Sequence, residues 1–121
     1  MSILVLQREI IYKNELINNK IVWYGDKTLN NNNRQFYLKS IKYVIIIYNA
    51  AKDSLEDVKS LINVYNNLFN NKNIELIIYS IITNITKYIY EVLEYLNNTF
   101  TDITFIKNDI NDINNYIINN L

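Results

Sequence analysis

The hydrophobic pattern of the chain consists of short apolar runs separated by polar turns. The most apolar run, residues 42–48, leads through a short polar turn into a segment whose apolar positions recur at helical spacing. Its isoleucines and valine are β-branched, which is typical of a strand that is buried on both faces. We therefore expect a central strand at 42–48 that is followed by a helix.

Start signals for that helix lie just after the polar turn. Asp53 or Ser54 can accept hydrogen bonds from the first N–H groups of the helix, and Glu56 stands three residues after Asp53 in a capping-box arrangement. The helix is expected to end near Asn70-Asn71. Its apolar positions fall on one face: Leu55, Val58, Leu61, Ile62 and Tyr65.

The other apolar runs predict further strands and helices on both sides of this unit. Strands are expected at 2–6, 20–24, 74–80 and 102–106, helices at 85–96 and 110–121, and a short helix at 34–40. Gly25-Asp26 ends the second of these strands. The asparagine-rich segment 29–33 is expected to be a surface loop.

Two interpretations of residues 7–19 remain open. Ile10, Ile11, Leu16 and Ile17 alternate with charged residues in a rough helical face, which favours a helix. The alternative is a β-hairpin in which 8–13 and 20–24 are antiparallel partners joined by a polar turn, because asparagine tolerates the left-handed backbone conformation.

The alternation of strands and helices indicates an α/β fold. Nearly unbroken apolar strands predict a doubly wound, mainly parallel sheet of five to six strands with helices on both faces, formed by residues 1–121 as a single domain. An all-α fold is the structural alternative, because the abundance of Asn, Ile and Tyr blurs the periodicity. A single Gly and the absence of Pro leave few helix-breaking signals.

Composition excludes several classes of function. Twelve basic and twelve acidic residues give a net charge of zero, so we expect protein partners rather than nucleic acid or an anionic membrane. The absence of Cys and His removes disulfides, thiol nucleophiles, imidazole bases and the commonest zinc ligands. No apolar run approaches the roughly 20 residues that span a bilayer or forms a signal peptide, so an intracellular protein is expected.

The sequence lacks the glycine-rich loop that binds phosphate. A phosphate-binding loop needs glycine so that backbone N–H groups can approach the phosphates, but Gln7-Arg8-Glu9-Ile10 follows the first expected strand. Three Lys-hydroxyl pairs resemble the end of such a loop, although none has glycines before it: Lys27-Thr28, Lys39-Ser40 and Lys59-Ser60. Chance pairing explains all three.

Other candidate sites are also incomplete. A receiver domain would need an aspartate after the third strand to accept a phosphoryl group, but Asn49 stands there and cannot form an acyl phosphate. Ser80 and Lys107 do follow strands as a receiver requires, although a surface serine and a strand-end lysine are the simpler interpretation. Asp109 and Asp112 favour a solvated helix start over a catalytic pair. No catalytic, cofactor-binding or metal-binding residue is therefore assigned.

Residues 45–61, IIIYNAAKDSLEDVKSL, resemble the middle of a Ras-superfamily small GTPase. Members of that family typically read a strand, Y-D, a short turn and then S-F-x-x-V-x-x-W. Tyr48-Asn49 corresponds to the first motif and SLEDVKSL, from Ser54 to Leu61, to the second. The segments that follow keep the order and spacing of the family, so the similarity covers roughly two-thirds of the chain.

The motifs through which that family binds nucleotide are missing. Gly25-Asp26 represents D-x-x-G only in reversed order, Ser80-Ile81-Ile82-Thr83 replaces N-K-x-D, and only Lys107 remains of S-A-K. The resemblance therefore implies a non-catalytic pseudo-GTPase that needs no nucleotide or other cofactor and uses its fold as an interaction surface. It implies protein partners within a larger complex, such as the nuclear inner kinetochore, or a cytoplasmic role as a degenerate Rab-like trafficking protein.

Overall fold

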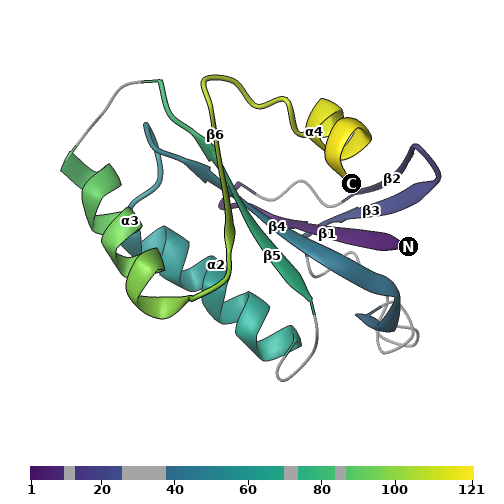
Figure 1. Ribbon diagram of the computed structural model, residues 1–121, viewed down its shortest axis with the longest axis horizontal. Coiled ribbons are helices and arrows are strands. Elements are labelled where there is room, and N and C mark those ends of the chain that lie inside the picture. Colours follow the sequence, from purple (N-terminus) through teal and green to yellow (C-terminus); the bar gives the residue numbers. More distant parts are fainter. Residues whose placement is uncertain (10–12, 26–37, 70–73, 84–86) are drawn as a thin grey trace.

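A computed structural model describes residues 1–9, 13–25, 38–69, 74–83 and 87–121. Strands and helices alternate along the second half of the chain, and the first half contributes strands (Figure 1). The described elements are β1 (Ser2–Leu6), β2 (Lys13–Ile17), β3 (Lys20–Tyr24), β4 (Ile41–Asn49), α2 (Leu55–Leu68), β5 (Glu75–Ile81), α3 (Lys87–Thr99), β6 (Thr104–Asn108) and α4 (Ile113–Asn120). The fold is α/β, so the all-α alternative is wrong.

The strands form one six-stranded sheet in the order β2-β3-β1-β4-β5-β6. Five neighbouring strands from β3 to β6 are parallel, and β2 pairs antiparallel with β3 at one edge. The prediction that residues 42–48 form a central strand is confirmed, because β4 lies between β1 and β5.

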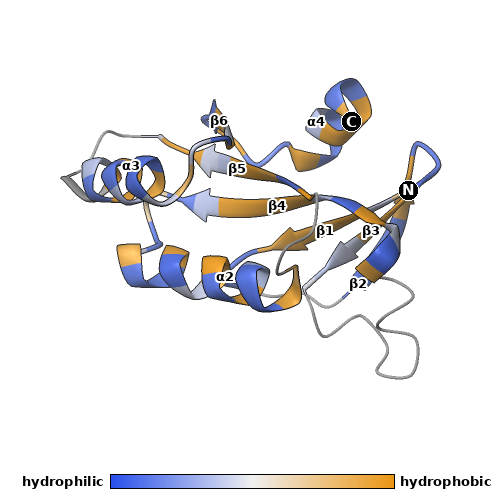
Figure 2. Ribbon diagram, turned by 60° about the horizontal axis from the view of Figure 1, so that its bottom comes forward, coloured by the Kyte–Doolittle hydropathy of each residue, from blue (hydrophilic) through white to orange (hydrophobic). Residues whose placement is uncertain are grey.

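Two apolar cores cover the two faces of this sheet (Figure 2). On one face, alternate residues of β1, β4 and β5 pack with α2 and α3, whose buried residues include Val58 and Val92. On the other face, the intervening strand residues pack with Ile113 and Ile117 of α4. Burial on both faces explains why β1, β4 and β5 read as continuous apolar runs.

Of the two interpretations left open for residues 7–19, the structure shows the hairpin and not the helix. Lys13–Ile17 pairs with Lys20–Tyr24. The hairpin interpretation placed the partner strand at 8–13, and the observed strand begins at the last residue of that range. Asn18 and Asn19 connect the strands with φ values of 49° and 65°. Two consecutive residues at positive φ produce a turn whose twist suits a two-residue hairpin, and asparagine adopts this conformation at low cost. Residues 10–12 lie outside the described residues.

Of the two predicted caps of α2, Asp53 and Ser54, the structure confirms Ser54. Ser54 is the N-cap residue and forms a capping box with Asp57: the Ser54 hydroxyl accepts a hydrogen bond from the Asp57 N–H at 3.2 Å, and the Asp57 carboxylate accepts one from the Ser54 N–H at 2.8 Å. The predicted box of Asp53 and Glu56 is wrong, because the Asp53 carboxylate accepts hydrogen bonds from Arg8 and the Asn49 N–H.

The remaining elements lie close to their predicted positions. The last strand and the last helix each begin two to three residues later than predicted, at Thr104 and Ile113. Leu38–Ser40 is helical, as expected for the end of the short helix at 34–40. Residues 34–37, the loop 29–33 and the expected start of the helix at 85–96 fall wholly or partly outside the described residues. No helix within the described ranges is long and apolar enough to cross a membrane.

Candidate functional site

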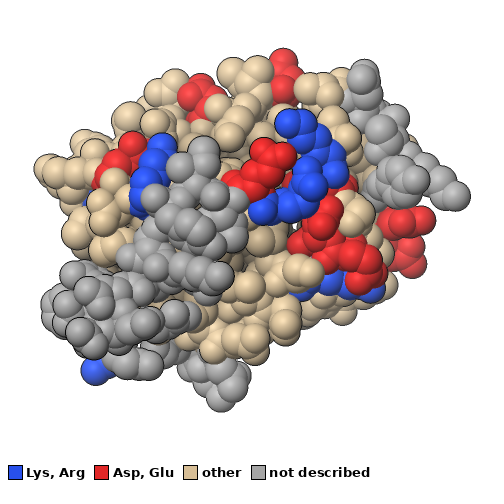
Figure 3. Space-filling view, turned by 180° about the vertical axis from the view of Figure 1, so that it is seen from behind, with Lys and Arg blue, Asp and Glu red and all other residues tan. Residues whose placement is uncertain are grey.

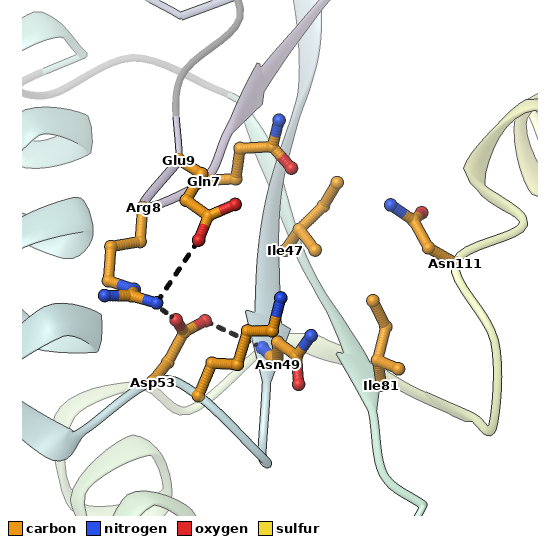
Figure 4. A pocket seen from close by; sticks show the side chains of 9 residues that line it. Gln7, Arg8, Glu9, Ile47, Asn49, Asp53, Ile81 and Asn111 are labelled. Atoms are coloured by element: carbon orange, nitrogen blue, oxygen red, sulfur yellow. Dashed lines mark hydrogen bonds and ion pairs between the residues drawn. The ribbon is translucent and has the colours of Figure 1, made fainter.

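The candidate site lies where the chain reverses direction across the sheet. From β1 the chain proceeds outward to β2 and β3, whereas from β4 it proceeds in the opposite direction to β5 and β6. Ligands of open α/β sheets bind in the crevice beyond the carboxyl ends of the strands at such a switch point. A cavity of about 220 Å³ opens here, beyond the ends of β1, β4 and β5 (Figure 4).

An ion pair crosses this crevice. The Arg8 guanidinium, from the loop after β1, donates from Nε to Oδ1 of Asp53 at 2.8 Å. The second carboxylate oxygen of Asp53 accepts a hydrogen bond from the Asn49 N–H, also at 2.8 Å. Only 6% of the Asp53 side chain is exposed, compared with 40% of Arg8. The loop after β1 is thereby tied to the turn that precedes α2 (Figure 4).

The turn that carries Asp53 is fixed by its own backbone. The Asn49 carbonyl accepts hydrogen bonds from the N–H groups of Lys52 at 3.1 Å and of Asp53 at 2.8 Å. The Asn49 side-chain oxygen accepts another from the Ala51 N–H at 3.1 Å. Asparagine favours turns for this reason. Asn49 therefore uses its carbonyl and its side-chain oxygen to form the turn.

The start of α2, which follows Asp53 directly, is capped by side chains of the chain itself. Hydrogen bonding from the Ser54 backbone, with a further contribution from its hydroxyl, holds the pKa of the Asp57 carboxyl below its usual value. Asp57 also lies 4.0 Å from Arg8 Nε. The first N–H groups of a helix bind phosphate well only when they are free to do so. Here the Asp57 N–H already donates to the Ser54 hydroxyl, and the Asp57 carboxylate accepts a hydrogen bond from the Ser54 N–H.

The structure brings together some of the residues that the sequence singled out and separates others. Gln7, Arg8, Glu9 and Asn49 line the cavity together. Ser80 is in register with Lys107 on β6 but is completely buried in the sheet. The requirement of a receiver site that all these groups meet at one rim is therefore not met.

Asp53 is the site residue whose role the sequence did not indicate. It was one of two expected caps of α2, but it accepts a hydrogen bond from Arg8, 45 positions earlier in the chain. The signal that could have indicated the pair is positional: an arginine and an aspartate follow neighbouring parallel strands, whose carboxyl ends meet at one edge of the sheet.

Two buried hydroxyl groups lie side by side beneath α2 and α3. Tyr48 of β4 and Ser80 of β5 are in register, and their side-chain oxygens have no hydrogen-bond partner within the described part of the protein. A buried hydroxyl without a partner loses its hydration and gains nothing in return.

Replacing Ser80 by alanine is therefore expected to leave the free energy of unfolding unchanged or to raise it by up to about 1 kcal/mol. Urea unfolding followed by the fluorescence of the single tryptophan, Trp23, measures this change. A loss of more than about 1 kcal/mol would show that the hydroxyl has a stabilising partner.

A second cavity of about 270 Å³ adjoins the first and shares Gln7 and Ile47 with it. The Tyr24 hydroxyl at this cavity donates to the Glu15 carboxylate at 2.5 Å. Burial, together with the hydrogen bond and the negative charge of Glu15, raises the pKa of Tyr24 well above its ordinary value of 10.0. Tyr24 is therefore a neutral hydrogen-bond donor here and not a base.

Four tyrosines have raised pKa values, so we expect the protein to lose stability in alkaline solution. Burial raises the pKa values of four tyrosines above 10.0 in the folded state: Tyr24, Tyr48, Tyr65 and Tyr116. As pH rises, the unfolded chain ionises these groups first, so their contribution is complete below pH 10.0 and decreases above it. Urea titrations across this range should show a falling midpoint that accompanies tyrosinate absorbance. A constant midpoint would contradict the assignment.

The other candidate residues do not form a site. Asp109 is exposed, and the Asp112 carboxylate accepts a hydrogen bond from Asn115 at 2.9 Å. Ser40 donates to the Ser2 hydroxyl, and Lys59 pairs with Glu56, so neither is part of a phosphate-binding loop. Lys27-Thr28 lies outside the described residues. Among the residues that the structure describes, no group of acidic side chains could hold a metal ion.

Comparisons with protein-family profiles, with curated proteins and with solved structures produced no match to this chain.

Proposed function

We propose that the chain is a pseudo-GTPase, a small-GTPase-like fold without nucleotide chemistry that acts as an interaction or scaffold subunit. The observation that carries the proposal is the ion pair between Arg8 and Asp53, at 2.8 Å, across the switch-point crevice. In a nucleotide-binding protein of this class, phosphates and Mg²⁺ occupy the region after the first strand. Here Arg8 and Asp53 pair with each other in that region.

The local geometry gives phosphate no source of affinity. A phosphate-binding loop works through free backbone N–H groups, a lysine and a hydroxyl that holds Mg²⁺. The loop after β1 instead offers Gln7, Arg8 and Glu9, and the Arg8 guanidinium is already paired with carboxylates. At the nearby start of α2, the Asp57 N–H already donates to the Ser54 hydroxyl, and the Ser54 N–H donates to the Asp57 carboxylate. A nucleotide would have to displace these interactions and would place its negative charge beside Asp53.

The arrangement of the sheet supports the small-GTPase interpretation. The resemblance of residues 45–61 requires a strand that ends at Tyr48-Asn49 and a helix that begins at Ser54-Leu55, and β4 and α2 have these bounds. The hairpin of β2 and β3 follows β1 after a short connection in which residues 7–9 are not helical. The layout is similar to that of centromere protein M, a degenerate small GTPase of the inner kinetochore.

The surface charges support a protein partner over nucleic acid. Lys and Arg side chains lie next to Asp and Glu side chains on the face shown in Figure 3. Nucleic acid is bound through clustered positive charge, and this chain has a net charge of zero. A nuclear role at the kinetochore and a cytoplasmic role as a degenerate Rab-like protein both require protein partners.

A pseudo-receiver signalling domain is the second candidate, and the strand order favours it. Without β2, the parallel strands run β3-β1-β4-β5-β6, which is the order 2-1-3-4-5 of a receiver. The burial of Ser80 weighs against it, because the corresponding hydroxyl of a receiver must reach a ligand at the rim. The antiparallel edge strand β2 is also foreign to a receiver sheet.

Purification of the tagged protein from its native cell tests the proposed role. We expect one or more proteins to co-purify in a stoichiometric complex that is unchanged by GTP, by GDP or by chelation of Mg²⁺, because no binding step involves the nucleotide. A complex that forms with GTP and dissociates with GDP would identify a working switch and overturn the proposal.

A further inference from the structure

The edge of the sheet at β2 carries an exposed apolar pair. Among the described residues, Leu16 is the most exposed large apolar residue, at 70%, and its cross-strand neighbour Ile21 on β3 is 40% exposed. Residues directly opposite each other on antiparallel strands point to the same face. Leu16 and Ile21 therefore form a continuous apolar surface at the outer edge of the sheet, where β2 lies (Figure 1).

The backbone of β2 is also suited to pairing with another strand. Within the described residues, β3 is the only strand that pairs with β2. Alternate residues of an antiparallel strand direct their N–H and C=O groups toward and away from the partner strand. Ile17 and Lys20 flank the two-residue turn and form a hydrogen-bonded pair. Leu16 is the next residue along β2, so its backbone N–H and C=O groups point away from β3, toward the open edge. An open edge with an exposed leucine is a site for adding a strand.

We propose that this edge binds a second copy of the chain, with the two β2 strands antiparallel about a two-fold axis at Leu16. In that pairing, Leu16 faces Leu16 of the second copy and Glu15 faces Ile17. The two exposed Ile21 side chains then flank the leucines, so four apolar side chains form one continuous contact. An isologous contact of this kind requires only that the strand be complementary to itself.

The charged residues of β2 favour a two-fold axis at Leu16 over an axis one residue earlier, at Glu15. An axis at Glu15 would place the two Glu15 carboxylates opposite each other, which is destabilising. An axis at Leu16 opposes no like charges, and Glu15 keeps its pairing with Lys13 at 3.8 Å and with the Tyr24 hydroxyl at 2.5 Å. The paired strands are only five residues long, so the interface is small and the dimer should be weak and dependent on concentration.

Sedimentation velocity over a concentration series tests the association. The native protein is expected to shift from monomer to dimer as its concentration rises, and Leu16→Lys is expected to weaken the dimer by at least about tenfold because two charges would then meet at the axis. Tyr90→Lys, at a 64% exposed position on α3, is the matched control and should leave the dimer unchanged. A native protein that remains monomeric throughout overturns the proposal.

Engineered cysteines test the register, because the chain has no cysteine of its own. Directly opposed residues bring their Cβ atoms close enough for a disulfide, so oxidised Leu16→Cys should form a covalent dimer at least about tenfold faster than Asn14→Cys or Tyr90→Cys. Faster crosslinking at position 14 than at 16, or equal crosslinking at 16 and 90, overturns this pairing. Neither experiment depends on whether the protein binds nucleotide.

Discussion

Replacing Asp53 by alanine is expected to lower the free energy of unfolding by about 2–3 kcal/mol. The change leaves the Asn49 N–H without its acceptor at 2.8 Å and removes the partner of Arg8. Most of the loss is expected from the hydrogen bond of the Asn49 N–H and not from the ion pair, since the Arg8 side chain is 40% exposed and water screens its charge. Urea unfolding followed by Trp23 fluorescence measures the change.

Two variants separate the contributions of Asp53. Asp53→Asn keeps one acceptor for the Asn49 N–H but loses the negative charge, so it should cost less than alanine does. Asp109→Ala, at an exposed position in the loop before α4, is the control and should change the free energy of unfolding by less than about 0.5 kcal/mol. If Asp53→Ala costs no more than this control, the hydrogen bonds of Asp53 do not stabilise the fold.

Replacing Tyr79 by phenylalanine is expected to cost about 1–3 kcal/mol. The Tyr79 hydroxyl accepts hydrogen bonds from the Asn108 side chain at 2.9 Å and the Asp112 N–H at 3.2 Å, and it donates to the Ile110 carbonyl at 3.3 Å. These three bonds connect β5 to the last residue of β6 and to the loop between β6 and α4. Phenylalanine keeps the ring packing against Tyr116 but leaves all three groups without this partner.

Hydrogen exchange locates the effect of the Tyr79 change. Amide protection should fall in α4 and the loop before it, and it should persist in β1 and β4, which lie elsewhere in the sheet. Tyr90→Phe is the matched control because Tyr90 is largely exposed, and it should change neither protection nor stability. Unaltered exchange in α4 for Tyr79→Phe would mean that the ring alone fixes this loop.

The sequence predicted most of the sheet because strands buried on both faces leave a strong signal. Residues 2–6 and 42–48 are nearly all apolar, and such runs have few alternatives in a chain of 121 residues. The start of α4 was predicted too early because Ile110 is apolar and fits the helical stripe. Its carbonyl instead accepts a hydrogen bond from Tyr79, an interaction between residues 31 positions apart.

The hairpin and the crevice were harder to predict because they depend on tertiary pairing. Lys13–Ile17 contains one buried residue, Ile17. Leu16 is exposed in the structure, but in the sequence its apolar side chain beside Ile17 suggests the apolar face of a helix. Asn18 and Asn19 decide the conformation of the turn. Asparagine is common throughout the chain, so a single asparagine carries little information about where a turn lies. Asp53 looked like a helix cap because its arginine partner is remote in sequence.

Calorimetric titration of the purified chain with GTP and GDP in the presence of Mg²⁺ tests the central claim most directly. If Arg8 and Asp53 pair across the crevice and the start of α2 is capped by the chain itself, no saturable heat should appear even at millimolar nucleotide. A saturable isotherm with micromolar affinity for either nucleotide would show that the crevice opens to phosphate and would contradict the assignment as a pseudo-GTPase.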